Sequence, residues 1–210
     1  MRETLMIKAV IYDCDGVMFD SFEANFAFYE RIMTPLGQTL DRQDEATMRV
    51  LHTYANRDVL SYFFPDEPEK SRALDLAAAI DYRDLIPLMR MEEGFVKTLE
   101  ALQSRVHLAV CTNRSTSMEA VLLKFDLSRF FGCVMTASQV RNPKPHPDPL
   151  YRVLEYYRIA PHEALFVGDS EVDRQAAAAA GVPFVAYKAD LPGFARIEHH
   201  GAILPLLKRW

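Results

Sequence analysis

Two carboxylates, Asp13 and Asp15, stand two residues apart directly after a short apolar run at residues 8–12. Such a run is typical of a buried strand, so both carboxylates would project from its end. Gly16 follows and lets the backbone turn sharply. An ionised carboxylate can act as a nucleophile, while a second one donates and then accepts a proton. Taken alone, the pair could also be a solvated turn that caps the next helix or part of a calcium loop.

A second acidic pair follows another apolar run, at residues 164–167. Asp169 stands at the end of that run, and Asp173 lies four residues further on, in the first turn of an alanine-rich helix. Residues at this spacing share one helix face. Hard oxygen ligands from few protein groups suit Mg²⁺, which keeps several waters and also binds phosphate oxygens. The alternative is that both acids only complement the dipole of the helix.

Three further residues could bind an anionic oxygen. Thr112 and Asn113 follow an apolar run at residues 106–111, where a helix N-terminus comes next. Lys144 stands between Pro143 and Pro145, which stiffen its loop. Each has a structural alternative, since Thr112 and Asn113 could be an ordinary helix N-cap and Lys144 a solvated loop lysine.

Elements that would position these residues alternate along the chain. Strands are expected at residues 8–12, 106–111, 133–136, 164–167 and 184–187. Helices are expected at 95–103, 117–125, 150–157 with Asp148 as N-cap, and 174–180 with Gly181 after the last turn. This alternation predicts an α/β fold with a three-layer, Rossmann-like parallel sheet, and its strand C-termini share one edge where ligands bind.

Residues 22–90 interrupt the alternation and contain no convincing strand. Aromatic residues recur at helical spacing from Phe22, and further helices are expected at 42–54, 58–64 and 69–85. We therefore expect a catalytic core of residues 1–21 and 91–210 and a helical cap of residues 22–90. Its candidate substrate contacts are four basic residues, of which the first three would share one helix face: Arg42, Arg49, His52 and Arg57.

Composition narrows the function classes. The chain has 210 residues, half of them hydrophobic, and a net charge of −5, which argues against nucleic acid and anionic membranes as partners. Its three cysteines have no metal-binding spacing, and no long apolar segment is present. We expect a cytoplasmic protein, monomeric or homodimeric, without a disulfide between Cys14 and Cys111.

Taken together and in order, these motifs resemble those of the haloacid dehalogenase superfamily. The matching residues are Asp13-Cys14-Asp15-Gly16-Val17, Thr112-Asn113, Lys144-Pro145 and Gly168-Asp169-Ser170-Glu171-Val172-Asp173. The helical insert looks like the cap of the branch that contains phosphoglycolate phosphatase and β-phosphoglucomutase. Val17 departs from the threonine of most phosphatases in this branch, and Cys14 replaces a larger apolar residue.

The resemblance implies a Mg²⁺-dependent phosphatase that hydrolyses a small phosphorylated metabolite through an aspartyl-phosphate. Asp13 would be the nucleophile and Asp15 the acid/base. Thr112, Asn113 and Lys144 would surround the phosphoryl oxygens. Mg²⁺ would be held by Asp13, the Asp15 carbonyl and Asp169, with Asp173 in or near its coordination shell.

Four other functions share parts of this pattern. A β-phosphoglucomutase-like sugar phosphomutase has the same core residues and differs in the cap, and Val17 keeps it open. A phosphoacceptor signalling domain would lack a helical insert after the first strand. A haloalkanoate dehalogenase would not need Asp15 or the metal-binding acids. A non-catalytic binding protein would be expected to lack one of the motif residues, and none is missing.

Overall fold

The predicted parallel sheet is present in the computed structural model, which describes residues 6–208. Six strands pair in the order β5-β4-β1-β6-β7-β8, and every pairing is parallel. Five of them confirm the predicted strands, and the short β8 at the edge was not predicted. The strands are β1 (Ala9–Tyr12), β4 (His107–Cys111), β5 (Cys133–Met135), β6 (Ala164–Gly168), β7 (Phe184–Tyr187) and β8 (Ala195–Ile197).

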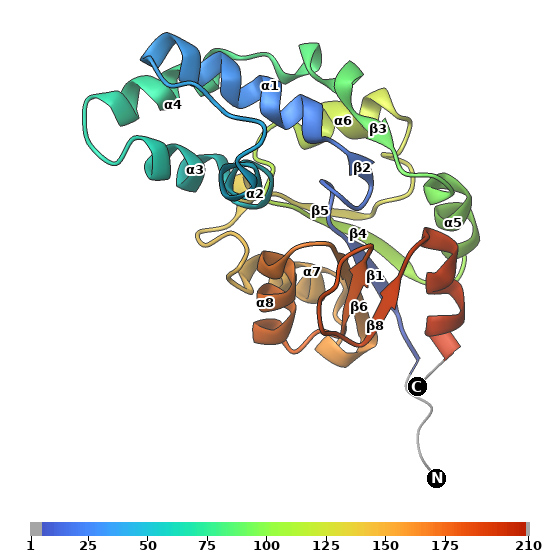
Figure 1. Cartoon of the computed structure of the whole chain (residues 1–210). Helices are drawn as coiled ribbons and strands as arrows, with labels where there is room; N and C mark the ends of the chain where they lie inside the picture. Colours follow the sequence, from blue (N-terminus) through green and yellow to red (C-terminus); the bar gives the residue numbers. More distant parts are fainter. Residues whose placement is uncertain (1–5, 209–210) are drawn as a thin grey trace.

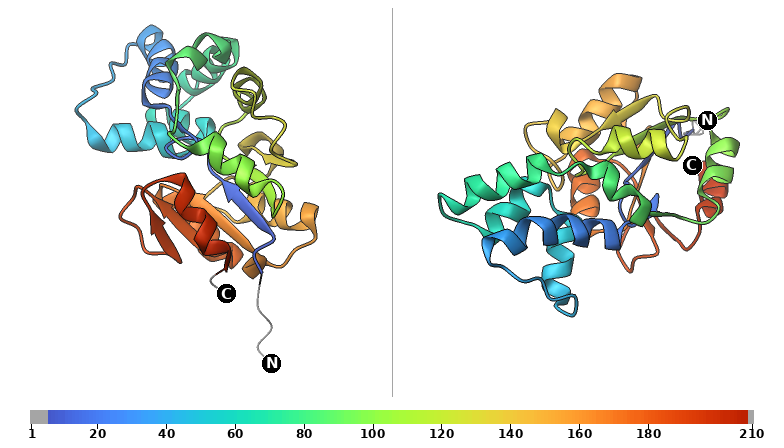
Figure 2. Two further views of the ribbon diagram at one scale, coloured as in Figure 1. Left: turned by 90° about the vertical axis from the view of Figure 1, so that its right-hand side faces the viewer. Right: turned by 90° about the horizontal axis from the view of Figure 1, so that it is seen from above.

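Helices cover both faces of this sheet and give it three layers (Figures 1 and 2). On one face, α7 (Asp148–Tyr157) and α8 (Glu171–Ala180) pack over Ala9 and Ile11 of β1. On the other face, α5 (Phe95–Leu102) and the 3-10 helix η6 (His200–Lys208) pack over Val10 and Tyr12, while α6 (Met118–Lys124) lies next to the helical insert (Figure 1). All four residues of β1 are buried, because a central parallel strand is covered on both sides.

A helical insert, residues 22–90, follows the first strand and lies beyond the C-terminal edge of the sheet (Figure 1). Its longest helix is α1 (Phe22–Met33), which buries Phe26, Tyr29 and Met33 as the aromatic spacing predicts. The other α-helices are α2 (Glu45–Thr53), α3 (Asn56–Phe63) and α4 (Glu69–Ala79). The limits expected for the core and the cap stay a prediction, and residues 1–5 and 209–210 lie outside the described part.

Two helix boundaries in the insert differ from those expected. The helix expected over residues 42–54 begins only at Glu45, because the Asp44 side chain accepts hydrogen bonds from the backbone N–H groups of Ala46 and Thr47 and caps it there. The helix expected over residues 69–85 ends at Ala79. Asp81 then caps a new turn, and the chain continues as two short 3-10 helices, η2 (Tyr82–Asp84) and η3 (Ile86–Leu88).

The expectation that residues 22–90 contain no strand is also corrected. Phe19–Asp20 (β2) pairs antiparallel with Arg90–Met91 (β3), so a two-stranded ribbon joins the insert to the core. Each strand has only two residues, too few for an alternating pattern to appear in the sequence. The chain therefore enters and leaves the insert at neighbouring positions.

Around the sheet, two helix starts are corrected and one helix end is confirmed. The helix expected from residue 174 begins at Glu171, because the Ser170 side chain caps it there. Asp148 is the first residue of α7 rather than its N-cap, which is Pro147. The Asp148 carboxylate instead accepts a hydrogen bond from Asn142 and pairs with His146. Gly181 ends α8 in the left-handed conformation, as predicted. Within residues 6–208, no helix is long and apolar enough to cross a membrane.

Candidate active site

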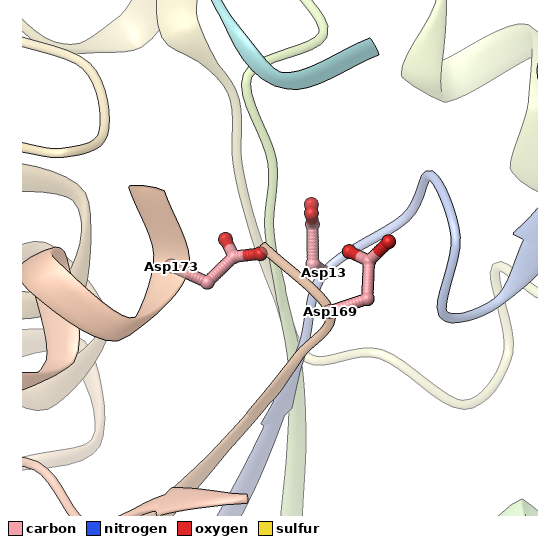
Figure 3. Close-up of side chains that lie close together, drawn as sticks. All are labelled: Asp13, Asp169 and Asp173. Atoms are coloured by element: carbon pink, nitrogen blue, oxygen red, sulfur yellow. The ribbon is translucent and has the colours of Figure 1, made fainter. Parts of the chain in front are cut away.

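Three carboxylates meet at the C-terminal edge of the sheet (Figure 3). Asp13 follows β1, Asp169 follows β6, and Asp173 lies in the first turn of α8. One oxygen from each of the three can be chosen so that all lie within 4.8 Å of one another. Adjacent parallel strands β1 and β6 bring the first two together, which is why residues so distant in sequence share one site. The sequence predicted this cluster.

Gly16 allows the Asp169 carboxylate to approach the loop after β1. Its φ is +73°, a region that other residues rarely adopt. A Cβ atom at this position would lie only 2.0 Å from Asp169 Oδ2. The loop therefore needs glycine both for its backbone conformation and for the space that the carboxylate fills.

Burial and mutual repulsion disfavour the ionised forms of the carboxylates in this cluster when no metal ion is bound. Burial and then the neighbouring Asp173 carboxylate raise the pKa of Asp13 to about 7. Burial, followed by the charges of Asp173 and Asp13, also raises the pKa of Asp169 well above its usual value. A bound divalent cation would favour the ionised form of both groups. The donor set, which contains only oxygen atoms, suits Mg²⁺.

Lys144 places a positive charge beside two carboxylates of this cluster, those of Asp13 and Asp173. Its side chain is buried, and its Nζ lies 2.9 Å from Asp13 Oδ1 and 2.6 Å from Asp173 Oδ1. Burial alone would lower the pKa of Lys144, but the two carboxylates raise it above the usual value. The lysine therefore stays charged beside the carboxylate of Asp13.

Asp173 differs from the other two acids because both its oxygens already have partners. Oδ1 pairs with Lys144, and Oδ2 accepts hydrogen bonds from the hydroxyl and the backbone N–H of Ser170. Asp169 accepts no hydrogen bond from the described residues, and Asp13 Oδ2 likewise has none. Asp13 and Asp169 are thus the carboxylates with free oxygens for a metal ion, while Asp173 positions Lys144 and the start of α8.

Asp15 makes an ion pair that the sequence did not predict. Arg114, just after β4, places its Nη2 atom 2.5 Å from Asp15 Oδ1, and its side chain is 5% exposed. Ser21 and Asn25 also donate to Oδ1. Burial would raise the pKa of Asp15, but Arg114 and these hydrogen bonds hold it below its usual value. Oδ2 accepts none of the hydrogen bonds found among the described residues, so it is the oxygen available for proton transfer.

Asn25 links this ion pair to the helical insert and determines the tautomer of His52. Its Oδ1 accepts hydrogen bonds from Tyr82 and Arg114, so its Nδ2 group is the donor to Asp15 and to His52 Nδ1. His52 Nδ1 is then an acceptor, and Nε2 carries the hydrogen. This Nε2 atom is buried and has no partner in the described part of the chain.

Thr112 and Asn113 are both buried at the end of β4. The Thr112 hydroxyl accepts a hydrogen bond from the backbone N–H of Arg114, but no helix begins here, because α6 starts only at Met118 with Ser117 as its N-cap. The Asn113 side chain donates to the backbone carbonyl groups of Lys144 and of Thr53, so it connects the lysine loop to the insert. Their contact with phosphoryl oxygens stays a prediction.

Two cavities meet at this edge and share Asp15 and His52 in their linings. The smaller, about 270 Å³, is lined by Ser21 and by Asp13, Asp15 and Asp169, three residues predicted to face a phosphoryl group or its metal ion. The larger, about 630 Å³, lies between the insert and the core loops at residues 113–117 and 137–143. We call them the phosphoryl cavity and the outer cavity.

Of the four basic residues predicted to contact substrate, the structure brings two to the cavities. His52 lines both cavities, and Arg57, in the first turn of α3, lines the outer one. Arg49 is exposed on α2 and lines neither. Arg42 precedes α2, so it does not share a helix face with the others; it pairs with Glu23 at 2.8 Å and stacks on Phe26.

Arg114, Ser21 and Asn25 were not predicted to be site residues. Arg114 directly follows Thr112 and Asn113, so its position after a strand was a usable signal. Ser21 and Asn25 gave no comparable signal, because they lie at the start of a helix whose aromatic pattern indicates only packing.

Comparison with known proteins identifies the class. The family model for haloacid dehalogenase-like hydrolases matches residues 10–187. The chain therefore belongs to this family, and it is a phosphatase that hydrolyses phosphoric monoesters.

Individual relatives agree with this assignment. Phosphoglycolate phosphatase of Escherichia coli K12 is 34% identical over 213 residues, which covers 85% of this chain and 80% of the relative. A crystal structure of a haloacid dehalogenase-superfamily hydrolase from Geobacter sulfurreducens is 64% identical, with a TM-score of 0.77 and 96% of each chain covered. β-Phosphoglucomutase from Clostridium difficile has the same fold at 20% identity, with a TM-score of 0.79, 94% of this chain and 93% of that chain covered.

Proposed function

We propose that the protein is a Mg²⁺-dependent phosphatase that hydrolyses a small phosphorylated metabolite through an aspartyl-phosphate on Asp13. The proposal is supported above all by the position of Asp13, which lies close to Lys144, Asp169 and Asp15 at the C-terminal edge of the sheet. The names of the curated relatives support a small phosphorylated substrate. The three buried free thiols support a cytoplasmic location.

The first step forms the covalent intermediate. Asp13 attacks phosphorus, the bond between phosphorus and the ester oxygen breaks, and the leaving alcohol takes a proton from Asp15 Oδ2. Asp15 therefore has to be protonated when the substrate is bound, although Arg114 favours its ionised form. Lys144, beside Asp13 Oδ1, stabilises the negative charge on the transferring phosphoryl oxygens. Arg114 holds Asp15 by Oδ1, so the other oxygen can face the leaving group.

The second step releases phosphate. Asp15, now ionised, accepts a proton from water, which attacks phosphorus and breaks the bond to Asp13. Inorganic phosphate leaves, and both carboxylates return to their starting forms. The ion pair with Arg114 favours the ionised form that this step requires.

Asp13, Asp169 and the backbone carbonyl of Asp15 would hold the metal ion. Bound Mg²⁺ would offset the repulsion between an anionic nucleophile and an anionic phosphate ester. Asp173 would support the site by fixing Lys144.

The test is hydrolysis of p-nitrophenyl phosphate with Mg²⁺ by the native protein and by Asp13→Asn. The variant should lose at least ~10³-fold in turnover, since both covalent chemistry and metal binding depend on this carboxylate. The exposed Asp66→Asn serves as the control. Beryllium fluoride should attach to Asp13 in the native protein. Near-normal turnover by Asp13→Asn would refute the mechanism. If the phosphoryl group were transferred to a sugar phosphate and no inorganic phosphate were released, the protein would be a mutase.

A further inference from the structure

The outer cavity is large for the leaving group of a small phosphate ester. Its volume of about 630 Å³ falls in the range of pockets that bury drug-sized ligands. A leaving group such as glycolate has two carbons and would contact only a small part of the walls. The phosphoryl cavity, at about 270 Å³, is separate and holds Asp13 and Asp169.

The position of Asp15 makes the outer cavity the place for the leaving group. Asp15 lines both cavities, and the proton that it donates goes to the ester oxygen. With phosphorus beside Asp13, the ester oxygen lies near Asp15, and the rest of the alcohol extends into the outer cavity. His52 stands at the same junction.

One wall of the outer cavity is apolar. Helices of the insert contribute aliphatic and aromatic side chains, and these would contact the hydrocarbon part of a substrate. They include Phe28, Leu51, Leu60, Leu74 and Ile80. Burying such surface against a ligand is favourable, at about 25 cal/mol per Å² of apolar area.

Two arginines that line the outer cavity have no ion-pair partner among the described residues. Arg114 is paired with Asp15, so its charge is already compensated. Arg57 on α3 and Arg141, in the loop after η4 (Ala137–Gln139), are exposed, and neither guanidinium has an ion pair within residues 6–208. Among the described residues that line the cavity, Asp58 is the only carboxylate besides Asp15, so the charges of Arg57, Arg141 and Asp58 sum to a positive value.

We propose that the substrate is a phosphoric monoester whose alcohol carries an apolar body and a second anionic group, which Arg57 and Arg141 bind. This inference rests on the proposed phosphatase activity and specifies the substrate class. Arginine is suited to this role because its planar guanidinium binds carboxylate and phosphate groups through two parallel hydrogen bonds.

The experiment compares four primary alkyl phosphates in the presence of Mg²⁺. They are 2-phosphoglycolate, 4-carboxybenzyl phosphate, its neutral analogue 4-carbamoylbenzyl phosphate, and 4-phosphonobenzyl phosphate. We expect kcat/KM for at least one of the two benzyl esters with a distal anion to exceed that of the neutral amide by ~10-fold or more, as for a hydrogen bond to a charged group. It should also exceed that of 2-phosphoglycolate. Whichever anion is preferred identifies the second anionic group as carboxylate or phosphate.

Variants assign this preference to residues. Arg57→Gln and Arg141→Gln should each reduce the ratio of kcat/KM between the preferred anionic ester and the amide, and the double variant should bring it close to one. Arg72→Gln, an exposed change on α4 outside the cavity lining, should keep the native ratio. The inference is overturned if the amide equals both anionic esters, if 2-phosphoglycolate is the best substrate, or if the double variant keeps the native ratio. Absence of hydrolysis of every ester, p-nitrophenyl phosphate included, would instead refute the proposed function and this inference with it.

Discussion

Arg114 and Asp15 form a buried ion pair with 2.5 Å between Nη2 and Oδ1, although 99 residues separate them in the sequence. The same guanidinium donates to Asn25 and lies over the ring of Tyr82, both in the helical insert. The arginine thus connects the Asp15 carboxylate, which follows β1 of the core, to the helical insert. In this arrangement a single oxygen of Asp15 takes all its hydrogen bonds.

Replacing Arg114 with methionine should therefore impair proton transfer to the leaving group. We expect kcat to fall ~10- to 100-fold with benzyl phosphate. This loss is smaller than the one expected when a general acid is removed, because Asp15 itself remains. The loss should be much smaller with p-nitrophenyl phosphate, whose leaving group needs little protonation. Arg114→Lys should restore part of the activity. Equal losses with both esters would show that Arg114 supports the fold or phosphate binding instead.

Gly16→Ala should weaken metal binding without unfolding the protein. The added Cβ would meet Asp169 Oδ2 at 2.0 Å and displace it. Gly94→Ala is the matched control, because its φ is also +73° but nothing lies within 4 Å of the added atom. Both substitutions should lower the free energy of unfolding by ~1–2 kcal/mol through the left-handed backbone. Only Gly16→Ala should raise the Mg²⁺ concentration needed for half-maximal activity; equal Mg²⁺ requirements in the two variants would contradict the steric argument.

Asp169 and Asp173 should respond differently to conversion to asparagine. Asp169→Asn removes a carboxylate with free oxygens, so the rise in melting temperature on adding Mg²⁺ should disappear. Asp173→Asn should keep that rise while the protein becomes less stable by ~1–2 kcal/mol, because the ion pair with Lys144 and the contacts that begin α8 weaken. Thermal melts with Mg²⁺ and with chelator measure both effects. Loss of the Mg²⁺ response in Asp173→Asn alone would reverse the assignment.

His200 should make stability depend on pH. Burial lowers the pKa of this imidazole to about 4, and it stacks on Tyr187 and contacts the Val17 carbonyl. Its unfolded pKa is near 6.5, so between about 6.5 and 4 the unfolded chain binds more protons than the folded one. The histidine's stabilising effect is therefore complete above pH 6.5 and falls as pH drops to about 4, by on the order of 3 kcal/mol.

Urea unfolding at several pH values measures this dependence. His200→Phe should be less stable at neutral pH, since the hydrogen bond to Val17 is lost, but its free energy of unfolding should change less between pH 6.5 and 4. A variant with the native pH dependence would show that other groups, such as the paired carboxylates, account for it.

The sequence predicted those parts of the fold that repeat a local pattern. The apolar runs at β1 and β6 indicated buried strands, and acidic residues at their ends indicated the cluster of Asp13 and Asp169. The sequence did not reveal the partner of Asp15, because no local pattern connects Arg114 to a loop so distant in the chain. The helix start at Glu45 was missed because Arg42 and Gln43 are residue types common in helices, and only the capping side chain of Asp44 marks the boundary. The edge strand β8 is too short for a periodic signal.

The two-residue ribbon of β2 and β3 has a consequence for how such an enzyme can change. Asp20 and Arg90 face each other across it, so both ends of the insert leave the core at one point (Figure 1). The sheet contains no strand from the intervening segment, and its hydrogen bonds do not depend on that segment. A different segment could be spliced between these two positions without altering the order of the strands. The ribbon thus allows the whole insert to be exchanged as a unit, while the carboxylates of Asp13 and Asp169 stay where the sheet places them.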